Sequence, residues 1–334
     1  MRLSFLGVLG VALLLSGCDN REYFEPQKRY ATVAQHTYLS PIVQIGAKGA
    51  TLENGKFIGS RGISAFALPK GYRFLNESSR YILASHVSGA LDLLDKRTGK
   101  VVKHISFSLP VVSATELHGT IAYILNNNTF GLYDIKAGKK RFEQHSEATF
   151  AINTKAANPL FIDTIVVMPM LDGKLILVDT ANPEKRKSIY LSSENALNNI
   201  ILLSKVGEKL VAATSNRMMV LGDVQKSYCA NISEVVLSKN RIFVLTKEGE
   251  VVALDFGLKV VERKMFPHAM FVASTYANHR VYALDIKGSL IVLSSDLKRS
   301  KIYDVGEVES SVWMANGKLY KDGKIIDLTT LSNE

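Results

Sequence analysis

The residue types that could perform chemistry do not occur at the spacings that catalysis or metal binding requires. No two histidines have the His-x-Glu-x-x-His spacing or another spacing typical of metal ligands, and this 334-residue chain holds two cysteines. A Gly-x-Ser-x-Gly nucleophile elbow is also missing from the sequence. We therefore expect no catalytic residue, no metal and no cofactor. The histidines are His36, His86, His104, His118, His145, His268 and His279.

Two sets of residues resemble reactive groups and have simpler interpretations. His86 and Asp92 flank Gly89 like a catalytic pair, but a histidine beside a hairpin is far more often a surface residue than a general base. Four aspartates recur at matching positions and could be imagined as a calcium ring. We expect instead that each caps its own hairpin through hydrogen bonds to the backbone. They are Asp95, Asp134, Asp179 and Asp255.

The recurring positions belong to a repeated turn. Six turns show one spacing, in which a Gly or Asn precedes a short apolar run that ends six residues later, usually at Asp. Gly and Asn tolerate positive φ in tight turns, so the backbone conformation of the turn explains why these residues recur at this spacing. These structural turns begin at Gly89, Asn128, Gly173, Asn216, Gly249 and Gly288. Weaker copies at Asn54-Gly55 and Asp322-Gly323 bring the number of repeats to about eight, about 33 to 45 residues apart.

The apolar runs on both sides of each turn indicate the fold. Runs such as Ile242–Leu245 and Val251–Leu254 are apolar on both faces, which is typical of strands that are buried on two sides. The flanking segments alternate in part, as edge strands do. We predict an all-β, eight-bladed β-propeller of four-stranded antiparallel blades, with seven blades as the alternative count and a solenoid as the second architecture. The stretch near Pro41–Ile45 is expected to close the ring by pairing with the last blade.

The first residues resemble a lipoprotein export signal. A positive start, the apolar run Leu3–Leu15 and Leu15-Ser16-Gly17-Cys18 match the pattern of a signal peptide that ends in a lipobox. We therefore expect a signal peptide at 1–17, a lipid (palmitate) anchor on Cys18, a tether at 18–40 and one propeller domain at 41–334. Asp19 resembles the inner-membrane retention signal of enterobacterial lipoproteins, so the choice of membrane stays open. The remaining cysteine, Cys229, is expected to be a buried strand thiol.

The formal net charge is +10, and the basic residues follow the repeat. They lie in the hairpin between the third and fourth strands of each unit, and the same hairpin of every blade emerges on the same side of a propeller. We expect one basic rim that binds anionic lipid headgroups or an acidic partner protein, with simple solvation of the hairpins as the alternative. Nucleic acid is not an expected partner of an exported protein. The basic residues are Lys96, Arg97, Lys100, Lys136, Lys139, Lys140, Arg141, Lys185, Arg186, Lys187, Lys298, Arg299 and Lys301.

The run from Gly89 to Asp95 with Thr98-Gly99-Lys100 is similar to the repeat of quinoprotein-like (PQQ-like) propellers, and with the lipobox the chain resembles the BamB family of outer-membrane assembly lipoproteins. Quinoprotein dehydrogenases carry a Trp in most blades, whereas this chain has only Trp313. The resemblance implies a non-enzymatic, periplasm-facing scaffold that binds envelope proteins, possibly a barrel-assembly complex, at the outer membrane. The alternatives are a degenerate quinoprotein-like subunit of a periplasmic redox or transport complex, or a sensor with a small ligand in the central channel.

Overall fold

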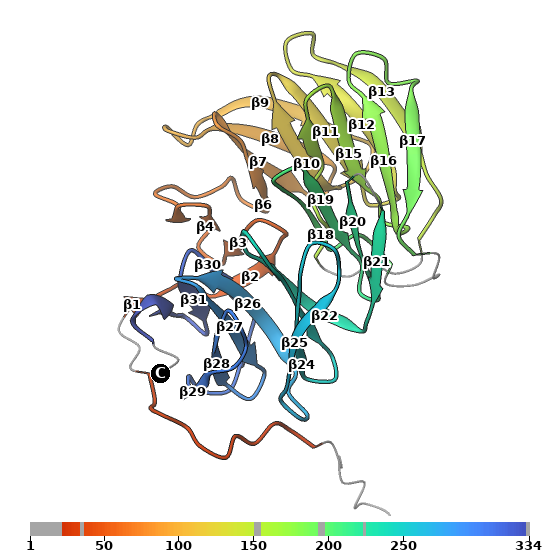
Figure 1. The fold of residues 1–334 in the computed structure, drawn as a ribbon. Helices are drawn as coiled ribbons and strands as arrows, with labels where there is room; N and C mark the ends of the chain where they lie inside the picture. Colours follow the sequence, from red (N-terminus) through yellow and green to blue (C-terminus); the bar gives the residue numbers. More distant parts are fainter. Residues whose placement is uncertain (1–21, 34–36, 150–154, 193–197, 223–224, 332–334) are drawn as a thin grey trace, which may run out of the picture.

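The protein is built from eight four-stranded antiparallel sheets that follow one another around a ring (Figure 1). The computed structural model describes residues 22–33, 37–149, 155–192, 198–222 and 225–331. A short 3-10 helix, η1 (Leu328–Thr330), follows the last strand. Over these ranges we find no helix with the length and apolar character that a membrane span needs. The predicted all-β, eight-bladed propeller is confirmed.

Blades 1 to 4 each use four consecutive strands. Blade 1 contains β2 (Ile42–Ile45), β3 (Ala50–Leu52), β4 (Phe57–Gly59) and β5 (Gly62–Ile63). Blade 2 contains β6 (Tyr72–Glu77), β7 (Tyr81–His86), β8 (Ala90–Asp95) and β9 (Val101–Ser106). Blade 3 contains β10 (Val111–Leu117), β11 (Thr120–Leu125), β12 (Thr129–Asp134) and β13 (Lys139–His145). Blade 4 contains β14 (Leu160–Ile162), β15 (Ile165–Pro169), β16 (Lys174–Asp179) and β17 (Arg186–Tyr190).

Blades 5 to 7 repeat this order, and blade 8 combines both ends of the chain. Blade 5 contains β18 (Leu202–Val206), β19 (Lys209–Ala213), β20 (Arg217–Leu221) and β21 (Lys226–Cys229). Blade 6 contains β22 (Ile232–Leu237), β23 (Ile242–Thr246), β24 (Glu250–Leu254) and β25 (Val260–Met265). Blade 7 contains β26 (Phe271–Ala277), β27 (Arg280–Asp285), β28 (Ser289–Ser294) and β29 (Ser300–Asp304). Blade 8 contains β30 (Val312–Ala315), β31 (Lys318–Lys321), β32 (Lys324–Asp327) and β1 (Thr37–Tyr38).

The ring is closed by an N-terminal strand, but the predicted position of that strand was wrong. Thr37 of β1 pairs with Ile325 of β32, whereas the stretch Pro41–Ile45 forms the innermost strand of blade 1 and pairs with β3. Ile42 is buried among apolar residues of blades 1 and 8, so this stretch is needed as the inner strand of blade 1. The closing strand therefore has to come earlier in the chain.

The core is divided into eight apolar clusters, one between each pair of neighbouring blades. The second and third strands contribute most of the fully buried side chains, as their two-faced apolar runs predicted. The clusters on the two faces of blade 1 contain six buried residues each, against fourteen between blades 6 and 7. Blade 1, which also has the shortest strands, is consequently the least extensively packed sector of the ring.

The repeated turns join the second and third strands, and one backbone hydrogen bond explains their residue preference. The N–H of Phe107, just after β9, donates to the carbonyl of Gly89 at 2.9 Å. Gly89 has a φ of +94°, and a Cβ there would lie 2.4 Å from the Phe107 carbonyl oxygen. A side chain is thus excluded where the outer strand passes the turn. Equivalent hydrogen bonds end at the carbonyls of Asn128, Gly173, Asn216, Gly249 and Gly288.

Positive φ at these turns is confirmed for five of the six predicted residues, and for Gly55 and Gly323 in the weaker copies. The expectation was wrong for Asn216, whose φ is not positive. In this turn the hydroxyl of Thr214 accepts from the N–H of Arg217 at 3.2 Å and donates to the Asn216 side chain at 2.6 Å. A side-chain hydroxyl therefore holds this turn in a different conformation.

The strand order gives the ring two distinct sides. We call the side that carries the turns between second and third strands, together with the connections from blade to blade, the upper side. The lower side carries the hairpins between first and second strands and between third and fourth strands. Since every blade has the same strand order, these definitions hold around the whole ring.

Residues 22–33, which we call the N-terminal strap, lie against blades 6 and 7. Phe24 is buried in the cluster between these blades, and Tyr30 and Val33 donate backbone hydrogen bonds to Ile302 and Asp304 near β29. In Figure 1 the strap runs beneath β28 and β29 toward β1. Within the expected tether at 18–40, residues 22–33 are therefore packed against the ring. The predicted lipid anchor and signal peptide lie outside the described residues.

We predict that Phe243→Ala lowers the free energy of unfolding by about 3 to 5 kcal/mol, because it leaves a cavity at a fully buried ring. Phe243 packs between blades 6 and 7 with its ring stacked on Tyr276, at a centroid distance of 5.9 Å. Urea unfolding measures the change. Val261→Ala, at a side chain of the same blade that is 46% exposed, is the control and should change stability by less than about 0.5 kcal/mol.

Candidate functional site

The predicted basic residues all lie on the lower side, in the third-to-fourth hairpins of blades 2, 3, 4 and 7 and the first residues after them. Lys96, Arg97 and Lys100 join β8 to β9, and Lys136 lies between β12 and β13. The other members of the set lie in the remaining hairpins or at the start of the outer strands. They are Lys139, Lys140, Arg141, Lys185, Arg186, Lys187, Lys298, Arg299 and Lys301.

The four recurring aspartates each cap a hairpin by accepting backbone hydrogen bonds, as predicted, whereas Ser294 and Asp296 do this in blade 7. Asp95 accepts from the N–H groups of Arg97 at 3.0 Å and Thr98 at 2.9 Å. The same pattern occurs at Asp134, Asp179 and Asp255. Hydrogen bonds from Thr98 hold the pKa of Asp95 below its ordinary value. The carboxylates therefore act as local caps that fix the hairpins from which the basic side chains project.

Most of the basic side chains on these hairpins are exposed and are not neutralised. Apart from Lys96 and Lys301, which are half-buried, all of them are exposed. Eight of the exposed ones form no ion pair with any acidic residue that the structure describes: Arg97, Lys100, Lys136, Lys139, Arg141, Lys185, Lys187 and Lys298. The lower side therefore presents positive charge that is free to interact with a negatively charged partner.

Other members of the set already make contacts within the chain. The Nζ of Lys96 lies 2.6 Å from an Oε of Glu77, and Lys140 pairs with Glu143 at 2.7 Å. Arg186 lies near Glu184 at 3.2 Å, and the Nζ of Lys301 lies 4.3 Å from the ring centre of Tyr30 in the strap. These side chains contribute to the fold and are weaker candidates for binding.

Several basic residues of the upper side also form ion pairs. Lys174 lies 2.6 Å from Glu147 and 3.2 Å from Asp172, and Lys287 lies 2.6 Å from Glu307. Further pairs on this side are Arg263 with Glu250 and Lys321 with Asp322. Ion pairs therefore occur on both sides of the ring, and the preference of a partner for the basic hairpins stays a prediction.

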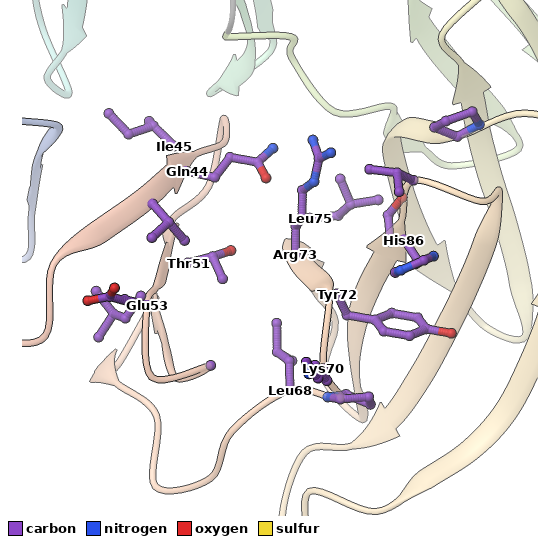
Figure 2. Close-up of a pocket in the computed structure, with 18 of the residues that line it drawn as sticks. Gln44, Ile45, Thr51, Glu53, Leu68, Lys70, Tyr72, Arg73, Leu75 and His86 are labelled. Atoms are coloured by element: carbon purple, nitrogen blue, oxygen red, sulfur yellow. The ribbon is translucent and has the colours of Figure 1, made fainter.

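A groove between blades 1 and 2 opens on the upper side. It encloses about 1080 Å³ and extends from the blade 1 turn near Glu53 to the inner strand β6 (Figure 2). Gln44 and Arg73 face the space between the two blades, and Tyr72 lies beside His86. Lys70 and Arg73 are exposed and form no ion pair with a described residue. The sequence contains these residues but gives no signal that places Arg73 in a groove.

The central channel is crossed by the connection between blades 3 and 4. Lys155 forms an ion pair with Glu234 on the inner strand of blade 6, and Asn158 donates to the Leu75 carbonyl of blade 2 at 3.3 Å. Ala157 also donates to the Ile200 carbonyl of blade 5 at 2.8 Å. Residues 155–158 thus occupy the channel that the sensor alternative would assign to a small ligand.

His86 and Asp92 do not form a pair. The Nδ1 of His86 lies 2.8 Å from the Ser88 hydroxyl, whereas the buried carboxylate of Asp92 lies 2.6 Å from Nδ1 of His104 on the neighbouring strand. Burial and the nearby Asp92 raise the pKa of Tyr72. The part of the chain that the structure describes contains no cluster of three or more His, Cys, Asp and Glu residues that could hold a metal ion.

The prediction of a buried thiol at Cys229 was wrong, since this residue is exposed. Cys229 ends β21, the outer strand of blade 5, in which only Tyr228 is partly buried against the cluster between blades 5 and 6. The apolar patterning that signals the inner strands is weaker at this edge, so sequence reasoning could not place the side chain.

Comparisons with known proteins add sequence relatives and fold relatives. None of the protein families compared matches the chain. Two sequences named plasminogen-binding protein PgbB, from Helicobacter pylori strains J99 and 26695, are 27% and 28% identical to it. Each alignment covers 96% of this chain and 68% of the relative.

Solved structures with little sequence identity share the fold. BamB from Moraxella catarrhalis superposes with a TM-score of 0.67 at 15% identity, covering 88% of this chain and 96% of BamB. Sqt1 from Saccharomyces cerevisiae superposes with a TM-score of 0.63 at 12% identity, covering 90% of this chain and 99% of Sqt1. The chain is therefore a BamB-like β-propeller in its architecture.

We predict that Glu77→Gln removes part of the acid sensitivity of folding. Burial by itself would raise the pKa of Glu77, but hydrogen bonds from Lys96 and Ser60 outweigh it and hold the pKa below the ordinary 4.5. A lowered folded-state pKa means that the extra stability is present above about pH 4.5 and is lost as the pH falls through the folded pKa. Urea unfolding at pH 6 and pH 3 should show a smaller loss for the variant.

Glu184→Gln is the matched control for this experiment, because Glu184 is a largely exposed acidic residue on the same side of the ring. It should leave the acid dependence of unfolding unchanged. An equal loss of stability on acidification in wild-type protein and Glu77→Gln would contradict the assigned role of the Lys96–Glu77 pair.

Proposed function

We propose that this chain is a lipid-anchored, non-enzymatic propeller of the bacterial cell envelope that binds a protein partner through its lower side. One observation carries the proposal: the lower-side third-to-fourth hairpins of blades 2, 3, 4 and 7 hold eight exposed basic side chains without an acidic partner among the described residues. Such charge speeds the encounter with an acidic surface and sets its orientation. The rigid ring keeps the hairpins in a fixed arrangement.

The sequence relatives support a protein as the partner. Two proteins aligned over 96% of this chain are named plasminogen-binding proteins, so plasminogen is the first probe to use. The proposal extends their named binding property to this chain, with the basic hairpins as the contact surface.

The envelope location is proposed from the N-terminal sequence. Cys18 at the end of an apolar run is the lipid attachment residue, with residues 1–17 as the signal peptide. Likeness to BamB in fold supports a place in outer-membrane protein assembly, with a barrel-assembly complex as an envelope partner. Asp19 favours the inner membrane under the enterobacterial sorting rule, and membrane fractionation of the native protein decides between the two.

We predict that the combined substitutions Lys139→Glu, Lys185→Glu and Lys187→Glu weaken plasminogen binding at least tenfold at physiological salt. The reason is that six units of charge are removed from one patch, and the binding of the unmodified protein should itself weaken as salt is raised. Surface plasmon resonance with the full lipidated chain in detergent measures both effects. None of the three residues has an ion pair in the described structure, so folding should be preserved.

The matched control reverses three basic residues toward the upper side, Arg217, Lys247 and Lys264, and should change the affinity by less than twofold. Crosslinking from native membranes then tests the envelope role with the same variants. The lower side would be excluded as the binding surface if both triple variants bound plasminogen with equal affinity and gave an identical set of crosslinked proteins.

A further inference from the structure

The N-terminal strap is fixed to the propeller by a buried aromatic anchor. Phe24 is 7% exposed and packs edge-on against Phe266, with ring centres 5.8 Å apart. It lies in the same cluster as Phe271 and Leu297, between blades 6 and 7. Removing a buried aromatic side chain from such a cluster is strongly unfavourable. The strap therefore behaves as part of the ring and its position is defined.

The strap reaches this anchor from the upper side. Glu22 pairs with His268, with 3.0 Å between an Oε of Glu22 and Nε2 of His268, and the Nζ of Lys287 lies 4.3 Å from the ring centre of Tyr23. His268 belongs to the connection between β25 and β26, and Lys287 lies in the turn between β27 and β28. Both elements are on the upper side as defined above. The first described residues of the chain are thus held there.

The chain length between Cys18 and Glu22 restricts where a lipid on Cys18 can be. Four residues span at most about 14 Å when fully extended. We propose that the lipid on Cys18 holds the upper side of blades 6 and 7 against the bilayer surface, which is the membrane-contacting face of this protein. The inference rests on the lipid anchor proposed above and adds the orientation of the ring.

The residues at this location suit the lipid–water interface. A hollow of about 910 Å³ lies between the strap and blades 6 and 7, and on the upper side it is bordered by Met265, which is 53% exposed. The Nζ of Lys287 lies 4.3 Å from the Tyr23 ring centre at the same side. Tyrosine rings and lysines of this kind settle at headgroup depth and attract anionic lipids.

The orientation also identifies the class of partner for the basic hairpins. A six-residue strand is about 20 Å long, so the lower side of blade 6 is held about that much farther from the bilayer than its upper side. Positive charge on the lower side then points away from the anchoring membrane. Its partner is consequently an acidic protein surface, and the headgroups of the same membrane are out of reach.

A pair of single-cysteine variants in the same blade tests the orientation. Lys247→Cys lies on the upper side and Lys259→Cys on the lower side, and both are exposed lysines of blade 6. Each is combined with Cys229→Ser and labelled with a fluorophore in the full lipidated chain. The proteins are reconstituted into phosphatidylcholine and phosphatidylglycerol vesicles that contain a lipid-borne quencher. We expect quenching at residue 247 to exceed quenching at residue 259 at least threefold.

Mass spectrometry of the N-terminal peptide is measured on the same samples, so that two failures can be told apart. A Cys18 without lipid would overturn the anchor and the orientation together. Lipid on Cys18 with equal quenching at both labels, or with stronger quenching at residue 259, would overturn the orientation alone and leave the anchor in place.

The variant Phe24→Ala tests whether docking of the strap orients the ring, or whether a short flexible connection to the lipid is enough. We expect this substitution to release the strap and to abolish the difference in quenching, while lipidation and the unfolding transition of the ring persist. Gln27→Ala, at an exposed strap residue, is the control and should keep the difference. A difference that survives Phe24→Ala would show that the strap does not orient the ring, which contradicts the proposal.

Discussion

Most blades depend on a neighbour at each face, because their second and third strands are apolar on both faces. Residues such as Leu83 and Val252 are fully buried and lie in clusters shared by two blades. A row of such sheets can bury both faces of all its members only if the last sheet meets the first. Closure is therefore a requirement of the burial pattern, and β1 is the element that supplies it.

Closure of the ring also determines where the charged side chains lie. A closed ring of identically ordered strands gathers all third-to-fourth hairpins on one side, so charge clusters that are distant in sequence come to share a surface. Ion pairs neutralise several basic residues on the opposite side, including Lys174 and Lys287. Residues 155–158 cross the channel, where they bond to blades 2, 5 and 6 and Ala156 lines the groove beside Arg73. The outer surfaces and the groove beside Arg73 are left as the places where a partner can bind.

The N-terminal strap links the ring to whatever precedes it. Its docking between blades 6 and 7 uses the largest of the apolar clusters, whereas closure occurs next to blade 1, where the clusters are smallest. The strap thus docks on a well-packed part of the ring, and the closing strand β1 lies in a less extensively packed part. Any pull on the N-terminus would be carried first by Phe24 and the blades around it, before it reached the closing strand.

The sequence by itself determined the features that arise between residues a few positions apart. Positive φ at Gly89 and the capping hydrogen bonds of Asp95 are local, so the turns, the blade count and the caps could be predicted. Tertiary structure decided which strand closes the ring, that Asp92 contacts His104, that Cys229 is exposed and that Phe24 is buried. These outcomes depend on neighbours that are remote in sequence or on burial at a sheet edge, and local spacing carries no information about either.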